Sequence, residues 1–284
     1  MTYQQAYLDG KKYLQEAGTD SPAFDALQLF SHCFFMDRQG LAIHGAQEAP
    51  ATELARYRDL IRQRGEGRPL QYLLGEWEFM GLPFSVGEGV LIPREDTEVV
   101  VRECARRLSG IKRPVVLDLC AGSGAVGIGL CSLLPGAQVT AVELSDQAYG
   151  YLVENIRRNQ MEDRVTPIRG DILRDFSLVS NHTLDAVASN PPYIPSGDLT
   201  GLQREVQREP RMALDGGMDG LDFYRALTRR WSIKLKPGGV MAVEIGIHQA
   251  EAVSELFHQA GFQGVRIIPD LAGIPRTVSG LYPG

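Results

Sequence analysis

The pattern of apolar and polar positions divides the chain into two parts, and the first part predicts helices. Asp20-Ser21-Pro22 is typical of a helix cap with proline in the first turn, and "ATELARYRDLIRQR" predicts a helix from Pro50 that stops at Gly65. An apolar face is expected from Phe24, Leu27, Leu29, Phe30, Phe34 and Phe35. We therefore expect residues 1–74 to form a small all-helical domain.

Residues 75–93, "GEWEFMGLPFSVGEGVLIP", have a different character. Strand-forming residues are interrupted there by four glycines and two prolines. This composition favours a β-hairpin, which we expect to join two domains as a linker.

From residue 94 to residue 284, predicted strands and helices alternate. Strands are expected over "PVVLDLC", "AQVTAVEL", "RVTPIRGD", the run that ends at Ser189, "GVMAVEIG" and two closing segments. Helices are expected over "SGAVGIGLCSLL", "SDQAYGYLVENIRRNQ", "GLDFYRALTRRWSIKL" and "HQAEAVSELFHQA". Such alternation predicts an α/β fold, with a mostly parallel sheet covered by helices on both faces and ligands beyond the carboxyl ends of the strands.

Composition and charge narrow the class of protein. The chain has 284 residues, of which 44% are hydrophobic and 23% charged, as in an ordinary globular protein. No apolar run reaches the roughly 18 residues of a membrane helix, and the polar start does not resemble a secretory signal. We expect a cytoplasmic protein that does not contact membranes. The 29 basic and 35 acidic residues give a net charge of −6, which disfavours a protein that holds long nucleic acid.

Cysteine and histidine spacing predicts no metal site. Cys33, Cys104, Cys120 and Cys131 form no CxxC pair, and the five histidines are scattered without helical spacing. Reduced thiols and chemistry without a metal are the expectation.

The first stretch with chemical meaning is Asp118-Leu119-Cys120-Ala121-Gly122-Ser123-Gly124, at the end of a predicted strand. Its glycines allow a backbone turn to approach a ligand at the start of a helix. Gly122–Gly127 also fits GxGxxG, so a NAD site is a rival interpretation. Asp118 would repel a pyrophosphate and attract a cation, which favours S-adenosylmethionine, since this carries a sulfonium and an ammonium.

Two further strand ends carry carboxylates. Glu143 follows Gly124 by 19 residues and could accept hydrogen bonds from both hydroxyls of a ribose, in either cofactor. Asp171, in Gly170-Asp171-Ile172, would come within reach of an adenine amino group. Together they predict a nucleoside site.

A fourth strand end carries the stretch "SNPPYIPS", residues 189–196. Consecutive prolines end the strand, because they lack amide donors and restrict the preceding residue. The Asn190 side-chain oxygen and the Pro191 carbonyl could bind the two hydrogens of a planar NH₂ group and hold its nitrogen toward a sulfonium methyl. Pro192 would stiffen the turn, and Tyr193 would offer a stacking face.

These motifs together resemble those of class I S-adenosylmethionine-dependent methyltransferases, and more narrowly those of the PrmC/HemK family. The resemblance covers nearly the whole predicted α/β part and rests on "EWEF" (76–79), "LIPREDTE" (91–98), "DLCAGSGA", "SNPPYIP", "EPRMALDGGMDGLDFYR" (209–225), "EIG" (244–246) and "DLAGIPR" (270–276). It implies a Rossmann-like, mostly parallel seven-stranded sheet. It also implies a protein-(glutamine-N5) methyltransferase that modifies the Gly-Gly-Gln glutamine of class 1 peptide chain release factors and leaves S-adenosyl-L-homocysteine.

The resemblance also implies roles for individual residues. Its ribose acid corresponds to Glu143, its adenine-side residue to Ile172, and its NPPY motif to residues 190–193, with Asn190 touching both cofactor and substrate. Cys120 and Ile172 depart from the residues more often found there, which concerns adenine packing and not the reacting nitrogen. The glycine-loop contacts to the cofactor correspond to Cys120, Ala121, Gly122, Ser123 and Gly124.

Other functions remain open on the sequence. A nucleic-acid methyltransferase for the exocyclic amino group of adenine, cytosine or guanine would share the whole constellation. A NAD-dependent oxidoreductase or a nucleoside-binding protein would explain the glycine loop and leave NPPY unexplained. Within the favoured interpretation, we expect a monomer with no nucleic-acid partner, and a helical domain that recognises the release factor.

Overall fold

The computed structural model describes residues 1–284, which form two compact units. The helical unit comprises Met1–Glu76 together with Gln203–Arg208, and the sheet unit comprises Trp77–Leu202 together with Glu209–Gly284. The predicted domain boundary, after residue 74, lies two residues before the point at which the helical unit first ends, after Glu76. The hairpin predicted as a linker, within residues 75–93, lies almost entirely in the sheet unit.

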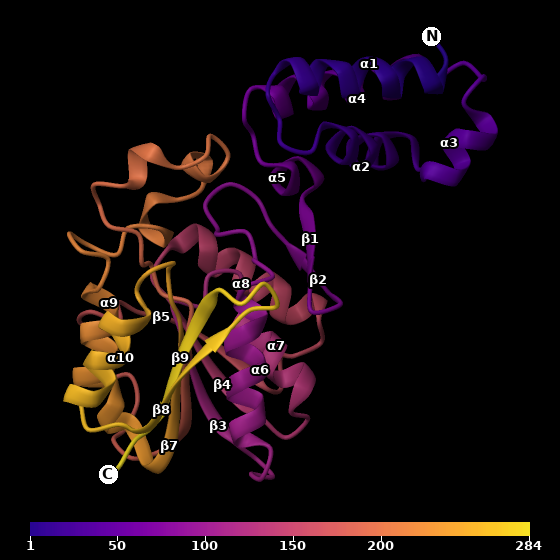
Figure 1. Ribbon diagram of the computed structural model, residues 1–284. Coiled ribbons are helices and arrows are strands. Elements are labelled where there is room, and N and C mark those ends of the chain that lie inside the picture. Colours follow the sequence, from indigo (N-terminus) through magenta and orange to yellow (C-terminus); the bar gives the residue numbers. More distant parts are fainter. The chain divides into compact units, whose positions relative to one another are not determined.

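The helical unit is built around the three long helices α1, α2 and α4, which pack on one another (Figure 1). Leu14, Leu29, Phe30 and Tyr57 are almost fully buried in its core. The phenol of Tyr57 lies so close to Gly10 that a β-carbon there would come within 2.3 Å of its oxygen. The five helices are α1 (Tyr3–Glu16), α2 (Pro22–Phe34), α3 (Arg38–His44), α4 (Ala51–Gly65) and α5 (Leu70–Leu74).

Two aromatic residues of the predicted apolar face lie outside this core. Phe24 is 49% exposed and Phe35 is 89% exposed. Phe35 adopts a left-handed conformation, with φ of 52°, and ends α2, so that its side chain leaves the helix face. Pro22 begins α2 as expected, but the Ser21 side chain makes no capping hydrogen bond.

A buried arginine joins the short segment 203–208 to the rest of the helical unit. Arg64 Nε donates to Asp25 Oδ2 at 2.6 Å, and Arg64 Nη2 lies 2.8 Å from Glu205 Oε2. Arg64 is only 5% exposed, so the ion pairs hold a charge that would otherwise be costly to bury. The sequence does not predict this attachment, because Glu205 is remote along the chain.

The sheet unit contains a seven-stranded sheet with the order β5-β4-β3-β6-β7-β9-β8. The strands from β5 to β7 pair in parallel, and β9 runs antiparallel to both of its neighbours. The strands are β3 (Val115–Leu119), β4 (Gln138–Glu143), β5 (Val165–Arg169), β6 (Leu184–Ser189), β7 (Leu235–Glu244), β8 (Gln263–Pro269) and β9 (Pro275–Leu281). The predicted α/β class and mostly parallel sheet are therefore confirmed. A separate hairpin is formed by β1 (Glu76–Phe79) and β2 (Leu82–Ser85).

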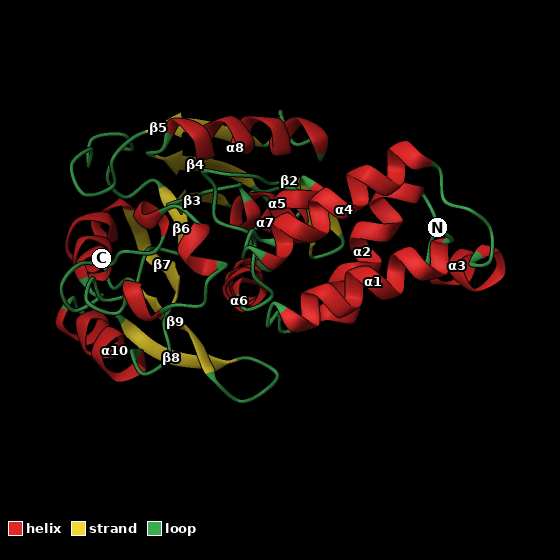
Figure 2. Ribbon diagram, turned by 90° about the horizontal axis from the view of Figure 1, so that it is seen from above, coloured by secondary structure: helices red, strands yellow, loops and turns green.

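Helices cover both faces of the sheet (Figure 2). One face packs on α6, α7 and α8, and the other packs on α9 and α10. These helices are α6 (Thr97–Leu108), α7 (Ala125–Leu133), α8 (Asp146–Arg158), α9 (Asp222–Ala226) and α10 (Ala250–Gln259). None of the helices has the length and apolar character needed to cross a lipid bilayer.

One predicted helix is not a single helix. The segment "GLDFYRALTRRWSIKL" forms α9, then a π-helical turn over Leu227–Trp231, then a 3₁₀ turn over Ser232–Lys234. Further 3₁₀ turns occupy Leu199–Gly201, Val206–Arg208 and Arg211–Ala213.

Candidate active site

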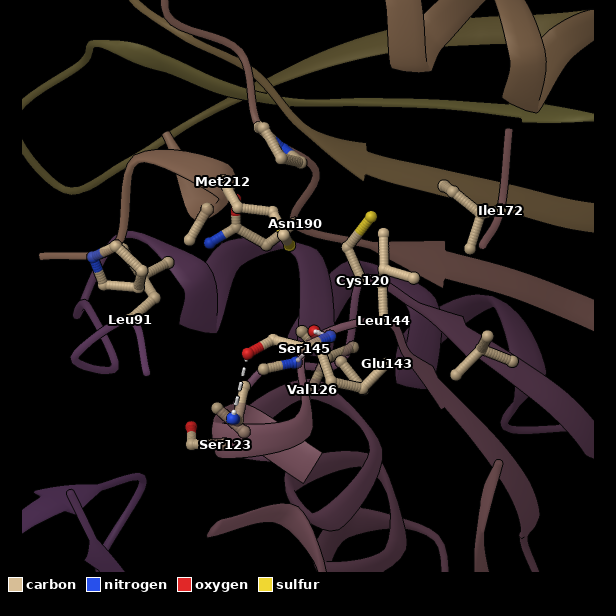
Figure 3. A pocket seen from close by; sticks show the side chains of 18 of the residues that line it. Leu91, Cys120, Ser123, Val126, Glu143, Leu144, Ser145, Ile172, Asn190 and Met212 are labelled. Atoms are coloured by element: carbon tan, nitrogen blue, oxygen red, sulfur yellow. Dashed lines mark hydrogen bonds between the residues drawn. The ribbon is translucent and has the colours of Figure 1, made fainter. Parts of the chain in front are cut away.

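A pocket lies in the sheet unit at the carboxyl ends of the parallel strands (Figure 3). Its cavity measures about 180 Å³. The turns that follow β3, β4, β5 and β6 each supply part of the wall. This is the edge at which ligands of such sheets bind. Of the predicted site residues, those that line the pocket are Cys120, Ala121, Gly122, Ser123, Glu143, Asp171, Ile172, Asn190 and Pro192.

The glycine loop turns sharply between β3 and α7. Three of its residues have positive φ: Cys120 (61°), Gly122 (55°) and Gly124 (89°). A β-carbon on Gly124 would come within 2.7 Å of Leu152 Cδ1, whereas one on Gly122 would meet no atom within 4 Å. Gly122 therefore leaves open space beside the backbone, and Gly124 is needed for packing against α8. Burial raises the pKa of the Cys120 thiol well above its ordinary value, so this side chain acts as an uncharged wall.

Glu143 reaches from the end of β4 to the glycine loop. Its Oε2 accepts from the amide of Gly122 at 2.8 Å, and its Oε1 accepts from the amide of Ser145 at 2.7 Å. The residue is 9% exposed and lines the pocket. Because an ionised carboxylate has about four acceptor positions, Glu143 keeps capacity for further donors such as ribose hydroxyls.

The turn after β5 supplies an apolar and an acidic part of the wall. Asp171 lines the pocket, and its Oδ1 accepts from the amide of Leu173 at 2.9 Å. Ile172 is 5% exposed, and its carbonyl accepts from the indole Nε1 of Trp231 at 2.8 Å. Trp231 thus fixes the backbone of the turn from behind.

Asn190 begins the turn after β6, and its side chain lines the pocket together with those of Glu143, at the end of β4, and Ile172, in the turn after β5 (Figure 3). Ser189, just before it, is fully buried, and its hydroxyl donates to the carbonyl of Leu119 at 2.6 Å. The Asn190 Nδ2 donates to the hydroxyl of Thr97 at 3.0 Å. With the nitrogen turned to Thr97, the side-chain oxygen is left to accept from a ligand.

Asp118 does not act as predicted. It is fully buried and does not line the pocket. Its Oδ2 accepts from the amide of Gly127 at 2.9 Å, inside α7, and its Oδ1 has no partner. Burial, with a smaller contribution from Glu143, raises the pKa of Asp118 to about 8 despite the bond from Gly127. The expectation that a charge on Asp118 attracts the ligand is wrong, because the carboxyl is fully buried behind the loop and does not line the pocket.

Three other predicted residues do not form the pocket wall. Gly124 turns the backbone at the start of α7, and Pro191 is buried. The Tyr193 hydroxyl points toward Glu244 Oε1, at 3.5 Å, and burial raises the pKa of this phenol. The wall is thus formed without the Tyr193 ring that was expected to offer a stacking face.

The remaining wall comes from residues whose role the sequence did not reveal. Most of these residues belong to the two motifs "LIPREDTE" and "EPRMALDGG", and these motifs were the only indication in the sequence of a role for the residues. Glu209 joins the two motifs, because its carboxylate accepts from the amide of Ile92 at 3.0 Å and pairs with Arg94. The residues of this wall include Leu91, Pro93, Arg94, Thr97, Pro210, Met212 and Phe223.

The pocket fits S-adenosylmethionine better than a dinucleotide. The amide of Gly122, which a pyrophosphate would need, is already bonded to a carboxylate. Arg94 is the one basic side chain in the wall, and it pairs with Glu209. Carboxylates and apolar side chains suit a ligand with two positive groups, a ribose and an adenine, so the donor set of these residues fits this cofactor.

The sheet order, the loop after β3, the carboxylate after β4 and the Asn-Pro-Pro-Tyr turn after β6 define a class I methyltransferase. A methyltransferase from Pyrococcus furiosus shares the fold, with a TM-score of 0.51 and 19% identity over 72% of this chain and 91% of that chain. The chain belongs to the release factor glutamine methyltransferase family, as the following sequence comparisons show.

Release factor glutamine methyltransferases resemble this chain along nearly its whole length. The protein of Geobacter sulfurreducens is 42% identical over 269 residues, which cover 94% of this chain and 92% of that protein. The protein of Moorella thermoacetica is 39% identical over 277 residues, which cover 97% of each. The PrmC N-terminal domain family matches residues 5–75, and a family described as conserved hypothetical protein 95 matches residues 98–217.

Proposed function

We propose that this chain transfers a methyl group from S-adenosyl-L-methionine to the side-chain amide nitrogen of the glutamine in the Gly-Gly-Gln motif of class 1 peptide chain release factors. The observation that carries the proposal is the orientation of Asn190. Its nitrogen is bonded to Thr97, so its oxygen can accept from an NH₂ group in the pocket. The names of the relatives supply the identity of the acceptor protein.

The reaction requires positioning more than acid or base strength, because the lone pair of an amide nitrogen is delocalised. The Asn190 oxygen would accept one N–H of the glutamine and direct its nitrogen. The main-chain carbonyl of Pro191, which follows Asn190 in the turn but does not line the pocket wall, would accept the other N–H when the glutamine enters. Pro192 restricts the turn that carries both acceptors. When bound, S-adenosylmethionine would supply the methyl carbon: as the nitrogen bonds this carbon, the carbon–sulfur bond would break with its electrons staying on sulfur, and the nitrogen would release one proton to water.

The remaining residues would hold the cofactor and its product, S-adenosyl-L-homocysteine. The backbone of Cys120–Gly124 would lie along the methionine part, and Glu143 would accept from the ribose hydroxyls. Asp171 and Ile172 would contact the adenine, one through its carboxylate and the other through its apolar side chain.

The helical unit would recognise the body of the release factor. Phe35 and Ile43 are 89% and 75% exposed in this unit, and exposed large apolar side chains are typical of contact surfaces. Since the proposed acceptor works in translation termination, we place the reaction in the cytoplasm, with the chain acting as a monomer.

Labelled S-adenosylmethionine tests the acceptor class. The protein is incubated separately with a purified class 1 release factor, with RNA and with DNA. The proposal expects label on the release factor alone, and little label on any acceptor when the Asn190→Ala variant is used. Label on RNA or DNA and none on the release factor would establish a nucleic-acid methyltransferase instead.

A further inference from the structure

We propose that Thr97 and Glu244 form a hydrogen-bond relay that sets which end of the Asn190 side-chain amide faces the acceptor. Thr97 and Glu244 would then be positioning residues for methyl transfer, and this proposal rests on the proposed function. The relay runs from α6 to the ends of β6 and β7. Thr97 lies 93 positions before Asn190 and 147 positions before Glu244 in the sequence.

The relay consists of two consecutive hydrogen bonds. The Thr97 hydroxyl donates to Glu244 Oε2 at 2.5 Å, and it accepts from Asn190 Nδ2 at 3.0 Å. Thr97 is 2% exposed and Glu244 is 2% exposed, so water does not compete for these bonds. Thr97 and Asn190 both line the pocket, whereas Glu244 lies behind them.

The chemistry of a hydroxyl gives the relay a direction. A threonine hydroxyl has one hydrogen, and an ionised carboxylate can only accept. When Glu244 is ionised, the Thr97 hydrogen is committed to it, so Thr97 can only accept from Asn190. The Asn190 nitrogen must then face Thr97, which leaves its oxygen to accept from one N–H group of a glutamine amide.

Protonation of Glu244 removes this constraint. The carboxyl can then donate to Thr97, and the freed threonine hydrogen can point to the Asn190 oxygen. The Asn190 amide can turn over and present its NH₂ group to the acceptor's NH₂ group, so that two donors meet. This state binds the glutamine amide poorly in the reactive orientation.

The surroundings of Glu244 bring its ionisation into the physiological range. Burial, the largest effect, raises the pKa of Glu244 to about 7; Asp96 raises it further, and Thr97, Arg276 and Tyr193 oppose the rise. Arg276 is itself paired with Asp96 at 3.0 Å and with Asp270 at 3.1 Å. Tyr193 faces Oε1 at 3.5 Å, while the Tyr224 hydroxyl donates to the main-chain carbonyl of Glu244 at 2.8 Å.

The test compares Thr97→Val, Thr97→Ser and Glu244→Gln with the wild-type protein. Thr97→Val keeps the shape of the side chain and removes its hydroxyl. We expect kcat to fall about tenfold, which corresponds to the loss of one hydrogen bond, while KM for the release factor stays similar. Thr97→Ser should restore most of this loss. In the wild type, kcat should rise with pH through about 7, and this rise should be absent in Glu244→Gln.

A second measurement needs neither acceptor nor cofactor. In ¹⁵N-labelled protein, the side-chain NH₂ signal of Asn190, assigned through Asn190→Ala, should exchange slowly with water above the Glu244 pKa. Exchange should be fast in Thr97→Val. This measurement tests the relay even if the wild-type protein does not methylate a release factor. The absence of methylation would reject the proposed function and would leave the relay to be decided by the exchange rates.

Thr228→Val is a matched control. Thr228 is 1% exposed, and its hydroxyl donates to the carbonyl of Tyr224 at 2.8 Å without lining the pocket. It should lose stability and keep the wild-type pH profile. Unchanged kcat and unchanged Asn190 exchange in Thr97→Val, or the same pH profile in Glu244→Gln as in the wild type, would overturn the relay.

Discussion

Glu143 accepts a hydrogen bond from the main-chain amide of Gly122 at 2.8 Å, and so joins the end of β4 to the glycine loop after β3. The two residues were predicted separately as cofactor contacts. Their bond means that the carboxylate also holds the loop that it faces. Loss of Glu143 should therefore affect the cofactor site twice, through the ribose acceptor and through the loop.

Replacing Glu143 by alanine should raise the Kd for S-adenosylhomocysteine at least about tenfold, the equivalent of one or two lost hydrogen bonds to a charged group. Isothermal titration calorimetry measures this directly. Glu154→Ala, which removes an exposed carboxylate on α8, is the control and should bind like the wild type. Equal affinity in Glu143→Ala and the wild type would remove its proposed role.

Asn190→Ala should separate binding from turnover. The side chain offers a hydrogen-bond acceptor to the reacting amide, so its removal should lower kcat roughly 10²-fold or more, as the loss of one preorganised partner does in other enzymes. The Kd for S-adenosylhomocysteine should stay within about tenfold. Normal turnover by this variant would show that the amide is held by other groups.

Asp118→Asn tests the burial of this carboxyl beneath the glycine loop. The folded-state pKa of Asp118 is raised from 3.8 to about 8, so its stabilising contribution is complete below the unfolded pKa and is lost as pH rises through 8. The amide cannot ionise, and its oxygen can still accept from Gly127. The variant should gain stability relative to the wild type as pH rises.

Thermal unfolding at about pH 5 and about pH 8.5 measures the difference, since these values lie within the window and above it. Affinity for S-adenosylhomocysteine should stay within about threefold of the wild type, because Asp118 does not line the pocket. A large loss of affinity in a folded variant would restore Asp118 as a cofactor contact.

Arg64→Leu should destabilise the helical unit by about 3 kcal/mol, because it leaves Asp25 and Glu205 without the cation that they share. Urea unfolding followed by circular dichroism gives the magnitude. Arg62→Leu is the matched control on the same helix. Arg62 pairs with Asp59 and Glu66, but its side chain is 53% exposed, so little change is expected. Similar losses in both variants would show that the buried ion pairs have no special importance.

The helical unit should matter for a whole release factor and not for a short Gly-Gly-Gln peptide. The double variant Phe35→Asn/Ile43→Ser should raise KM for the intact protein at least about threefold and leave the peptide reaction unchanged. Asparagine is chosen for Phe35 because it tolerates the left-handed backbone there. Ile111→Ser, at a 40% exposed position of the sheet unit, is the control. An unchanged KM would remove this surface from recognition.

Much of the sheet unit could be predicted from the sequence, because its strands are continuous apolar runs bounded by strong turn signals. The strand before Asn190 ends where the prolines require it to end. The irregular helical structure of the segment after Gly220 could not be predicted, since its residues favour one continuous helix. There, the Thr228 hydroxyl bonds to the carbonyl of Tyr224, four residues earlier, and the Trp231 indole bonds to Ile172, a tertiary contact that helix propensity does not contain.

The candidate site shows the same limit. The residues at strand ends were predictable, because parallel strands bring their carboxyl ends to one edge. Asp118 was misjudged because one position along a strand decides whether a side chain faces the ligand or the core. Thr97 and Glu244 belong to motifs that the sequence displays, yet their contact with Asn190 depends on how α6 and β7 pack, which no local pattern encodes.

The most direct test of the function uses two forms of one acceptor. A class 1 release factor and its variant with the Gly-Gly-Gln glutamine changed to alanine are incubated with the protein and labelled S-adenosylmethionine. We predict label on the first and none on the second. Equal label on both would contradict this prediction, because the methyl group would then be going to another residue.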